Sequence, residues 1–158
     1  MPMSGEDLRQ LYRSDQGSID RPTWWRAQAP LVLAILGLSV LWHFVAPYAH
    51  RSLAETKLLD GAAIAAYCYL IFYAFAVLLL LVASYSVSAK RFRDRGLDPG
   101  FAGLLPLALL LYGALDWTQQ QEGGMFPVWI VWAGAAMLAG VAGWTVWELG
   151  FAEPKAAR

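Results

Sequence analysis

The chain has 158 residues, enough for one domain, and its 12 Lys and Arg residues balance 12 Asp and Glu residues. Hydrophobic residues make up 58% of the chain and charged residues 15%, whereas a soluble domain is typically about 45–50% apolar and about 25% charged. This composition excludes intrinsic disorder and argues against a soluble globule. The zero net charge argues against nucleic acid as a partner, and the single cysteine, Cys68, excludes an internal disulfide.

The first part of the chain is a polar segment, residues 1–26. Leu8, Leu11 and Tyr12 follow one another at i, i+3 and i+4, so they share one face of a helix. A capping-box pattern lies directly before them. The sequence therefore predicts a short amphipathic helix near residues 5–13 that lies on the membrane surface.

Long stretches without Asp, Glu, Lys or Arg then follow, each of them bounded by charged residues. A helix rises ~1.5 Å per residue, so about 20 residues cross a hydrocarbon core of ~30 Å. The sequence predicts an all-α, polytopic membrane protein with a four-transmembrane-helix bundle over residues 27–147 and a tail over 148–158. The four helices are expected at residues 27–46, 61–88, 99–115 and 127–147.

The third of these segments is the shortest, and it contains Pro106. A proline inside a helix removes one backbone donor and tends to kink the helix. Two interpretations are open for residues 99–115, which either cross the membrane completely or form a re-entrant or interfacial segment. The distribution of Lys and Arg favours the complete crossing.

Lys and Arg residues are unequally divided between the two sides that four crossings create. The polar segment before the first helix and the loop after the second carry four each, and the tail carries two. The first loop carries two and the third loop none. The positive-inside rule then predicts that both termini and the second loop face the cytoplasm, and three crossings would give a weaker asymmetry.

Two motifs lie on this predicted cytoplasmic side, GSIDRPTWW at residues 17–25 and SAKRFRDRG at residues 88–96. Together they resemble the small bacterial membrane proteins of the domain of unknown function 805 family, over about residues 12 to 147. The residues that match the family's patterns are Gly17, Ile19, Arg21 and Trp25 in the first motif, and Arg91, Asp94 and Gly96 in the second. Lys90, Phe92 and Arg93 stand where the family has arginine, leucine and histidine. The resemblance implies a multi-helix inner-membrane protein without an established activity.

The second motif carries a cluster of cations, Lys90, Arg91, Arg93 and Arg95. One interpretation is a solvated cluster that only sets the topology. Another is a surface that contacts anionic lipids or a protein partner, because each basic residue near an anionic membrane surface contributes ~1 kcal/mol of binding.

A third interpretation is that the two motifs dock on each other, since each carries an acid beside arginines. In this hypothesis Arg21 pairs with Asp94, and Asp20 pairs with Arg91 or Arg93. These ion pairs would hold the first and second transmembrane helices together at the cytoplasmic face.

The last predicted helix carries small residues at regular spacing. Ala135, Ala139 and Gly143 recur at i, i+4 and i+8, and small residues at this spacing let two helices approach closely. We expect this face to pack on another helix, which belongs to the same chain, to a second copy or to a membrane protein partner.

The sequence contains no motif that indicates catalysis. His43 and His50 do not combine with a cysteine or carboxylate at the spacing of a metal site, and none of the four apolar stretches holds a charged residue that would mark an ion path. We therefore expect no enzyme, no metal and no cofactor. The expected function is a structural module, or one that binds a partner or lipids, in the bacterial inner membrane. The alternative is a small channel or transporter for a neutral solute.

Overall fold

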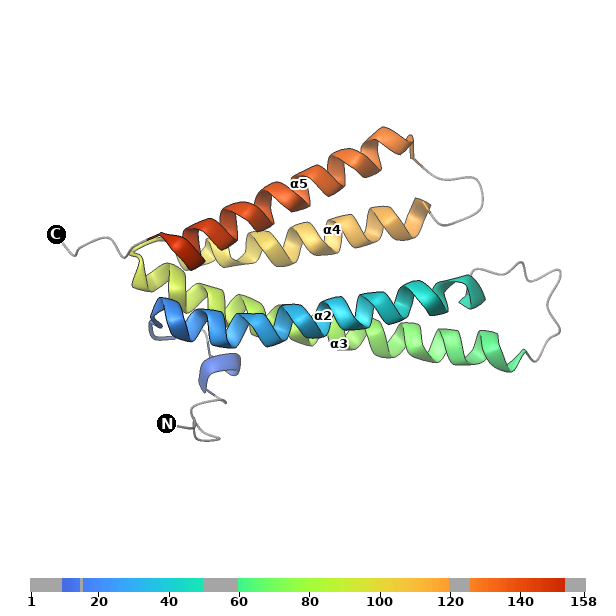
Figure 1. Cartoon of the computed structure of the whole chain (residues 1–158), viewed down its shortest axis with the longest axis horizontal. Helices are drawn as coiled ribbons and strands as arrows, with labels where there is room; N and C mark the ends of the chain where they lie inside the picture. Colours follow the sequence, from blue (N-terminus) through green and yellow to red (C-terminus); the bar gives the residue numbers. More distant parts are fainter. Residues whose placement is uncertain (1–9, 15, 50–59, 120–125, 153–158) are drawn as a thin grey trace.

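The computed structural model describes residues 10–14, 16–49, 60–119 and 126–152, and within these ranges the fold is helical without a strand (Figure 1). The long helices are α2 (Arg21–Ala49), α3 (Gly61–Asp94), α4 (Leu104–Gln119) and α5 (Val128–Val146), with a short 3₁₀ helix η1 (Pro99–Gly103) and a π-helical turn η2 (Trp147–Phe151). Four helical segments are long and apolar enough to span a membrane. This confirms the predicted all-α, multi-pass fold.

Two helices extend into charged sequence beyond the predicted spans. α2 begins at Arg21 because the Asp20 carboxylate accepts a hydrogen bond from the Thr23 amide at 3.2 Å and so caps the first turn. α3 continues through the second motif to Asp94 and ends where Gly96 adopts a φ of 68°. A left-handed residue at this position is the usual way to end a helix, and it suits glycine, which has no Cβ.

The third span consists of η1 and α4 together, and this segment, Pro99–Gln119, is 21 residues long. Pro106 lies in the first turn of α4, where a missing amide hydrogen leaves no helical hydrogen bond unmade. The length and the harmless position of the proline support a complete crossing.

Of the predicted N-terminal helix, residues 10–13 are helical, and residues 5–9 lie outside the described ranges.

The helices form two antiparallel hairpins, α2 with α3 and α4 with α5 (Figure 1). The hairpins meet mainly at one end, where η1 lies against α3 and η2 lies against α2 and α3, and they diverge toward the other end. In the diverging part, the ring centroids of Trp42 and Trp117 lie 6.2 Å apart. Only 6–11% of the residues in the spanning windows are buried, so most of their surface is left for lipid or for another protein.

The packing of α5 on α4 differs from the predicted face. α5 approaches α4 closely at Gly134, where an added Cβ would lie 2.9 Å from the side chain of Leu115. Ala135 is half-buried, Ala139 and Gly143 are exposed, and a Cβ added at Gly143 would meet nothing within 4 Å. The contact face is rotated by one residue relative to the prediction, so Ala139 and Gly143 do not pack within the chain. Contact of this face with a second copy or a partner remains a prediction.

Candidate functional site

The basic cluster of the second motif lies largely inside the protein. Lys90, Arg91 and Arg95 are only 4%, 1% and 5% exposed, and Arg93 is half-buried. Since α3 continues through the motif, these side chains line the junction between the two hairpins. The three buried cations therefore do not form the open surface for anionic lipids that the sequence suggested.

What the arginines bind is the end of the last helix. The backbone carbonyls of five successive residues each accept a hydrogen bond from a side chain of α2, of α3 or of Arg95, which directly follows α3. The donors and acceptors are Arg95 to Glu148 (2.6 Å), Arg91 to Leu149 (3.1 Å) and Ala152 (3.5 Å), Trp25 to Gly150 (3.2 Å), and Arg21 to Phe151 (3.4 Å). We call these four donor side chains and the carbonyls of residues 148–152 the lock.

The chemistry of the lock follows from how helices end. The last carbonyls of a helix have no partner within the helix, and they carry the negative end of the helix dipole. A guanidinium group offers five donors in a fixed plane and keeps its charge at any physiological pH. Arg91 uses this geometry fully, because it donates to two carbonyls and also pairs with Asp94.

An ion pair adds to these hydrogen bonds. Arg95 pairs with the carboxylate of Glu148 at 3.0 Å, and the two side chains are 6% and 20% exposed. Removing one partner of such a shielded pair is strongly destabilising, because the other charge is then left without compensation. The lock is thus selective for an acidic residue at position 148 as well as for a helix end.

Aromatic rings pack around the same carbonyls. Trp24, which is 1% exposed, meets Trp25 edge to face with the ring centroids 4.9 Å apart, and Trp25 contacts Phe151 in the same way at 6.0 Å. On the other side, Phe92 stacks on Trp144 at 5.7 Å. The bond from Arg91 to the Leu149 carbonyl is buried, and a hydrogen bond shielded from water is electrostatically stronger than an exposed one.

The two motifs do come together, but without two of the predicted ion pairs. Asp94 pairs with Arg91 of its own helix, and Arg21 donates to Phe151 instead of to Asp94. Asp20 caps α2 through Thr23, and Arg91 pairs with Asp94, although the charge of Arg91 still lowers the pKa of Asp20. Arg21 and Arg91 therefore reach the main chain of η2 in place of the predicted Arg21–Asp94 and Asp20–Arg91 pairs, and the alternative Asp20–Arg93 pair stays a prediction.

Asp20 gives a pH-dependent prediction. Its hydrogen bonds with Thr23 lower the pKa of the carboxyl below the ordinary value of 3.8, desolvation opposes this, and the positive charge of Arg91 lowers the pKa further. Because the folded pKa is lowered, the stability that Asp20 contributes is present above the unfolded pKa and is lost as pH falls through the folded pKa. We expect Asp20→Ala to cost about 1 kcal/mol of unfolding free energy at pH 7.

Thermal unfolding of both proteins in one detergent, at pH 7 and at pH 2, measures this difference. At pH 2 it should shrink. An Asp20→Asn variant keeps a capping acceptor without the charge, so it should keep most of the stability and lose the pH dependence. A deficit of Asp20→Ala that stays the same at both pH values would contradict the role assigned to the carboxylate.

Sequence reasoning found the donors of the lock and missed its acceptors. The acceptors are main-chain oxygens, and no residue type marks a main-chain oxygen that needs a partner. The one sequence feature that could have pointed to the acceptors is Gly150, since a glycine near a helix end often allows a close approach of another chain segment. In the structure it lies under the rings of Trp24 and Trp25.

A family model described as a protein of unknown function (DUF805) matches residues 12–148, and neither the curated proteins nor the solved structures give a match. Of the residues that carried the resemblance in the sequence, Arg21, Trp25 and Arg91 donate to carbonyls of the lock, Asp94 pairs with Arg91, and Gly96 follows the end of α3. Gly17 has a φ of 93°, and Ile19 packs on the core. Since the family model covers most of the chain and both motifs, the chain belongs to the DUF805 family of proteins of unknown function.

Proposed function

We propose that this protein is a non-catalytic structural module of the bacterial cytoplasmic membrane, which it crosses four times with both termini in the cytoplasm. Its lock fixes the two helical hairpins in one arrangement. The observation that carries this proposal is the capture of five successive carbonyls, residues 148–152, by side chains from the other hairpin. Such a contact has a mechanical role, because it joins two elements that otherwise diverge.

The distribution of charge supports the orientation. The lock end of the molecule carries the described cations of both motifs, among them Arg21 and Arg91, and Arg26 directly after the first motif. The start of α2 and the end of η2 lie together there (Figure 1). Lys and Arg favour the cytoplasmic side of membrane proteins. The lock end is therefore the cytoplasmic end in this proposal.

The bonding of polar side chains within the spans favours a structural role over the alternative of a channel. A channel for a neutral solute needs a continuous path of polar groups that remain open to the solute. Gln28 instead donates to Ser84 at 2.7 Å, the hydroxyls of Ser39 and Tyr73 meet at 3.1 Å, and Tyr69 donates to the Leu38 carbonyl at 2.8 Å. These bonds hold α2 on α3.

The exposed small residues of α5 give the module a surface for a partner. Ala139 and Gly143 allow the backbone of another helix to come close, and their exposed positions leave room for it. The partner in this proposal is a second copy of the chain or another membrane protein.

Labelling of single cysteines tests the first three of the four crossings and their direction. In a Cys68→Ser background, Gln16→Cys lies at the lock end and Gln119→Cys at the opposite end, so the two form a matched pair. A membrane-impermeant maleimide should label position 119 in intact spheroplasts and position 16 only after permeabilisation. The reverse pattern would overturn the orientation, and labelling of both positions from one side would overturn the four crossings.

A further inference from the structure

The start of α2 carries two arginines whose side chains are exposed, Arg21 and Arg26. The lock uses one hydrogen bond from Arg21, which donates its Nη1 to the carbonyl of Phe151 at 3.4 Å. A guanidinium group has several further N–H donors and keeps its positive charge. Arg26 is not among the donors of the lock. The structural role of the lock therefore leaves most of the binding capacity of these two groups unexplained.

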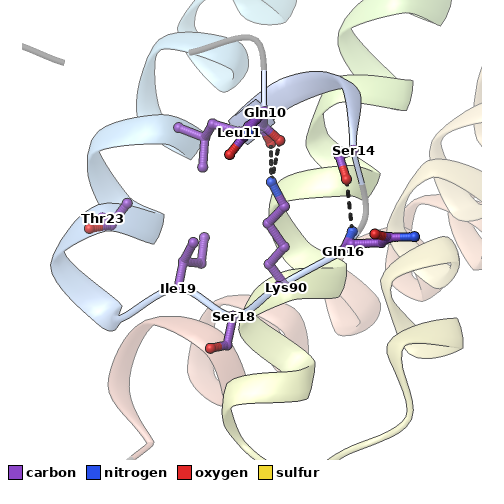
Figure 2. A pocket seen from close by; sticks show the side chains of 9 residues that line it. Gln10, Leu11, Ser14, Gln16, Ser18, Ile19, Thr23 and Lys90 are labelled. Atoms are coloured by element: carbon purple, nitrogen blue, oxygen red, sulfur yellow. Dashed lines mark hydrogen bonds between the residues drawn. The ribbon is translucent and has the colours of Figure 1, made fainter. Parts of the chain in front are cut away.

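The cations of the second motif face partners within the protein. Figure 2 shows Lys90 donating to the carbonyl of Gln10 and, at 3.1 Å, to that of Leu11. Arg91 and Arg95 are buried and donate to the end of the last helix. An anion that approaches this end of the molecule from outside thus finds the guanidinium groups of α2 accessible, while those of Arg91 and Arg95 are shielded.

The two arginines stand at the foot of an exposed apolar face of α2. Residues at i and i+7 lie on the same side of a helix, since seven residues make almost two turns. Arg26 is therefore in line with Leu33 and Val40, which are 68% and 58% exposed. Arg21 lies one turn before Trp25 on the adjoining side of the same exposed face. A hydrocarbon chain that lies along this face would end, toward the lock, at a positive charge.

Exposed aromatic rings lie at the same level of the molecule. The ring centroid of Trp25 is 6.0 Å from that of Phe151, which is 6.2 Å from that of Trp147. All three side chains are exposed, so this row of rings faces the surroundings of the protein. Tryptophan is enriched where membrane proteins meet the lipid headgroups. The row therefore places the start of α2 at the depth of the lipid phosphates.

We propose that an anionic phospholipid binds to this surface, with its phosphate at Arg21 and Arg26 and an acyl chain along Leu33 and Val40. The planar guanidinium group matches the oxygens of a phosphate and is well suited to bind it. A soluble phosphate ester would meet the arginines but leave the apolar face uncovered, so the lipid fits better. This goes beyond the proposed function, which needs no ligand.

The test uses the full chain, freed of lipid in a maltoside detergent. Native mass spectrometry compares phosphatidylglycerol with phosphatidylcholine of the same acyl chains, because both carry a phosphate and only the first has a net negative charge. Arg26→Gln removes one cation and leaves all four donors of the lock in place. Arg13→Gln is the matched control, since it removes the same charge from an exposed arginine outside α2. Arg21→Gln/Arg26→Gln removes both cations, and thermal unfolding in the same detergent checks its folding.

We expect the wild type to bind phosphatidylglycerol more tightly than phosphatidylcholine. Arg26→Gln should bind phosphatidylglycerol about fivefold more weakly, the loss expected for one cation beside an anionic headgroup, and the double variant more weakly still. Arg13→Gln should bind like the wild type.

Equal binding of the two lipids by the wild type overturns the proposal, as does wild-type binding by Arg26→Gln. An equal loss in Arg13→Gln and Arg26→Gln also overturns it, because the attraction is then spread over the whole end of the molecule. If the double variant does not fold, Arg26→Gln decides alone. The cysteine-labelling pattern does not depend on these affinities, so the two proposals fail separately.

Discussion

Replacing Arg91 by glutamine should lower the free energy of unfolding by about 2–4 kcal/mol, because a buried acceptor left without its donor costs about 1–3 kcal/mol and Arg91 serves three acceptors. The Arg91 side chain is 1% exposed. It pairs with Asp94 and donates to the carbonyls of Leu149 and Ala152. Glutamine is shorter and uncharged, so it leaves the partly exposed Asp94 carboxylate, the Ala152 carbonyl and the buried Leu149 carbonyl without this donor.

Unfolding of the full chain in one detergent, by heat and by denaturant, measures the change. Arg26→Gln is the matched control, because Arg26 belongs to α2 at the same end of the molecule and its side chain is exposed. Arg91→Lys keeps the charge, but one ammonium group cannot replace a planar guanidinium that bonds three acceptors. It should therefore lie between Arg91→Gln and the wild type. Equal stability of Arg91→Gln and Arg26→Gln would show that the lock contributes nothing.

The structure also predicts which contact opens first in the Arg91→Gln variant. The two hairpins meet mainly at η1 and η2, so the weakened contact should open locally before the whole chain unfolds. Hydrogen exchange of the amides in residues 147–152 should accelerate more than that of the α2–α3 contact around Gln28 and Ser84. Uniform acceleration along the chain would instead indicate that η2 and the hairpins unfold as one unit.

The number and the rough position of the helices could be predicted from the sequence because apolarity over a window is a local property. The ends could not, because other forces set them. α2 starts at Arg21 since Asp20 caps it. α3 continues as helix through Arg91 and Asp94 because Arg91 bonds to Leu149 across the junction and pairs with Asp94 one turn further along α3. An apolarity pattern ends a helix at its first charge, whereas packing allows the helix to continue.

The candidate site was likewise predicted only in part from the sequence. The motifs identified Arg21, Arg91 and Asp94 as residues that act together, and the structure brings them to one end of the molecule. Their partners were mispredicted because the sequence shows side-chain charges but not main-chain dipoles. The α5 packing face was displaced by one residue, to Gly134, since several small residues lie side by side and the rotation of a helix depends on its neighbour.

Gly150→Ala should be the most damaging conservative change at the end of the last helix, with a cost of about 1–3 kcal/mol, the usual effect of overpacking. A Cβ added at this position would lie 2.6 Å from Cζ2 of Trp25 and 3.3 Å from Cζ3 of Trp24. Neither ring can yield easily. Trp24 is 1% exposed in the core, and Trp25 donates its indole hydrogen to the carbonyl of Gly150 itself.

Gly143→Ala is the matched control, because it adds the same methyl group to α5 where nothing lies within 4 Å. In a helix interior alanine is favoured over glycine by about 1 kcal/mol, so the control should be neutral or stabilising. Both proteins are compared by thermal unfolding in one detergent. If Gly150→Ala unfolds at the same temperature as Gly143→Ala, or above it, the close approach of the two rings does not exist.

A second background separates steric conflict from other effects of the Gly150 substitution. Trp25→Leu removes the benzo ring that the new methyl group meets, and it loses the indole hydrogen bond whether position 150 is glycine or alanine. In this background the cost of Gly150→Ala should therefore fall well below its cost beside Trp25, as expected for two residues in direct contact. An unchanged cost would mean that the loss of stability comes from the backbone of η2 and not from its contact with α2. Because Trp25 and Gly150 belong to different hairpins, the reduced cost would show that η2 packs directly against α2 at this point of the lock.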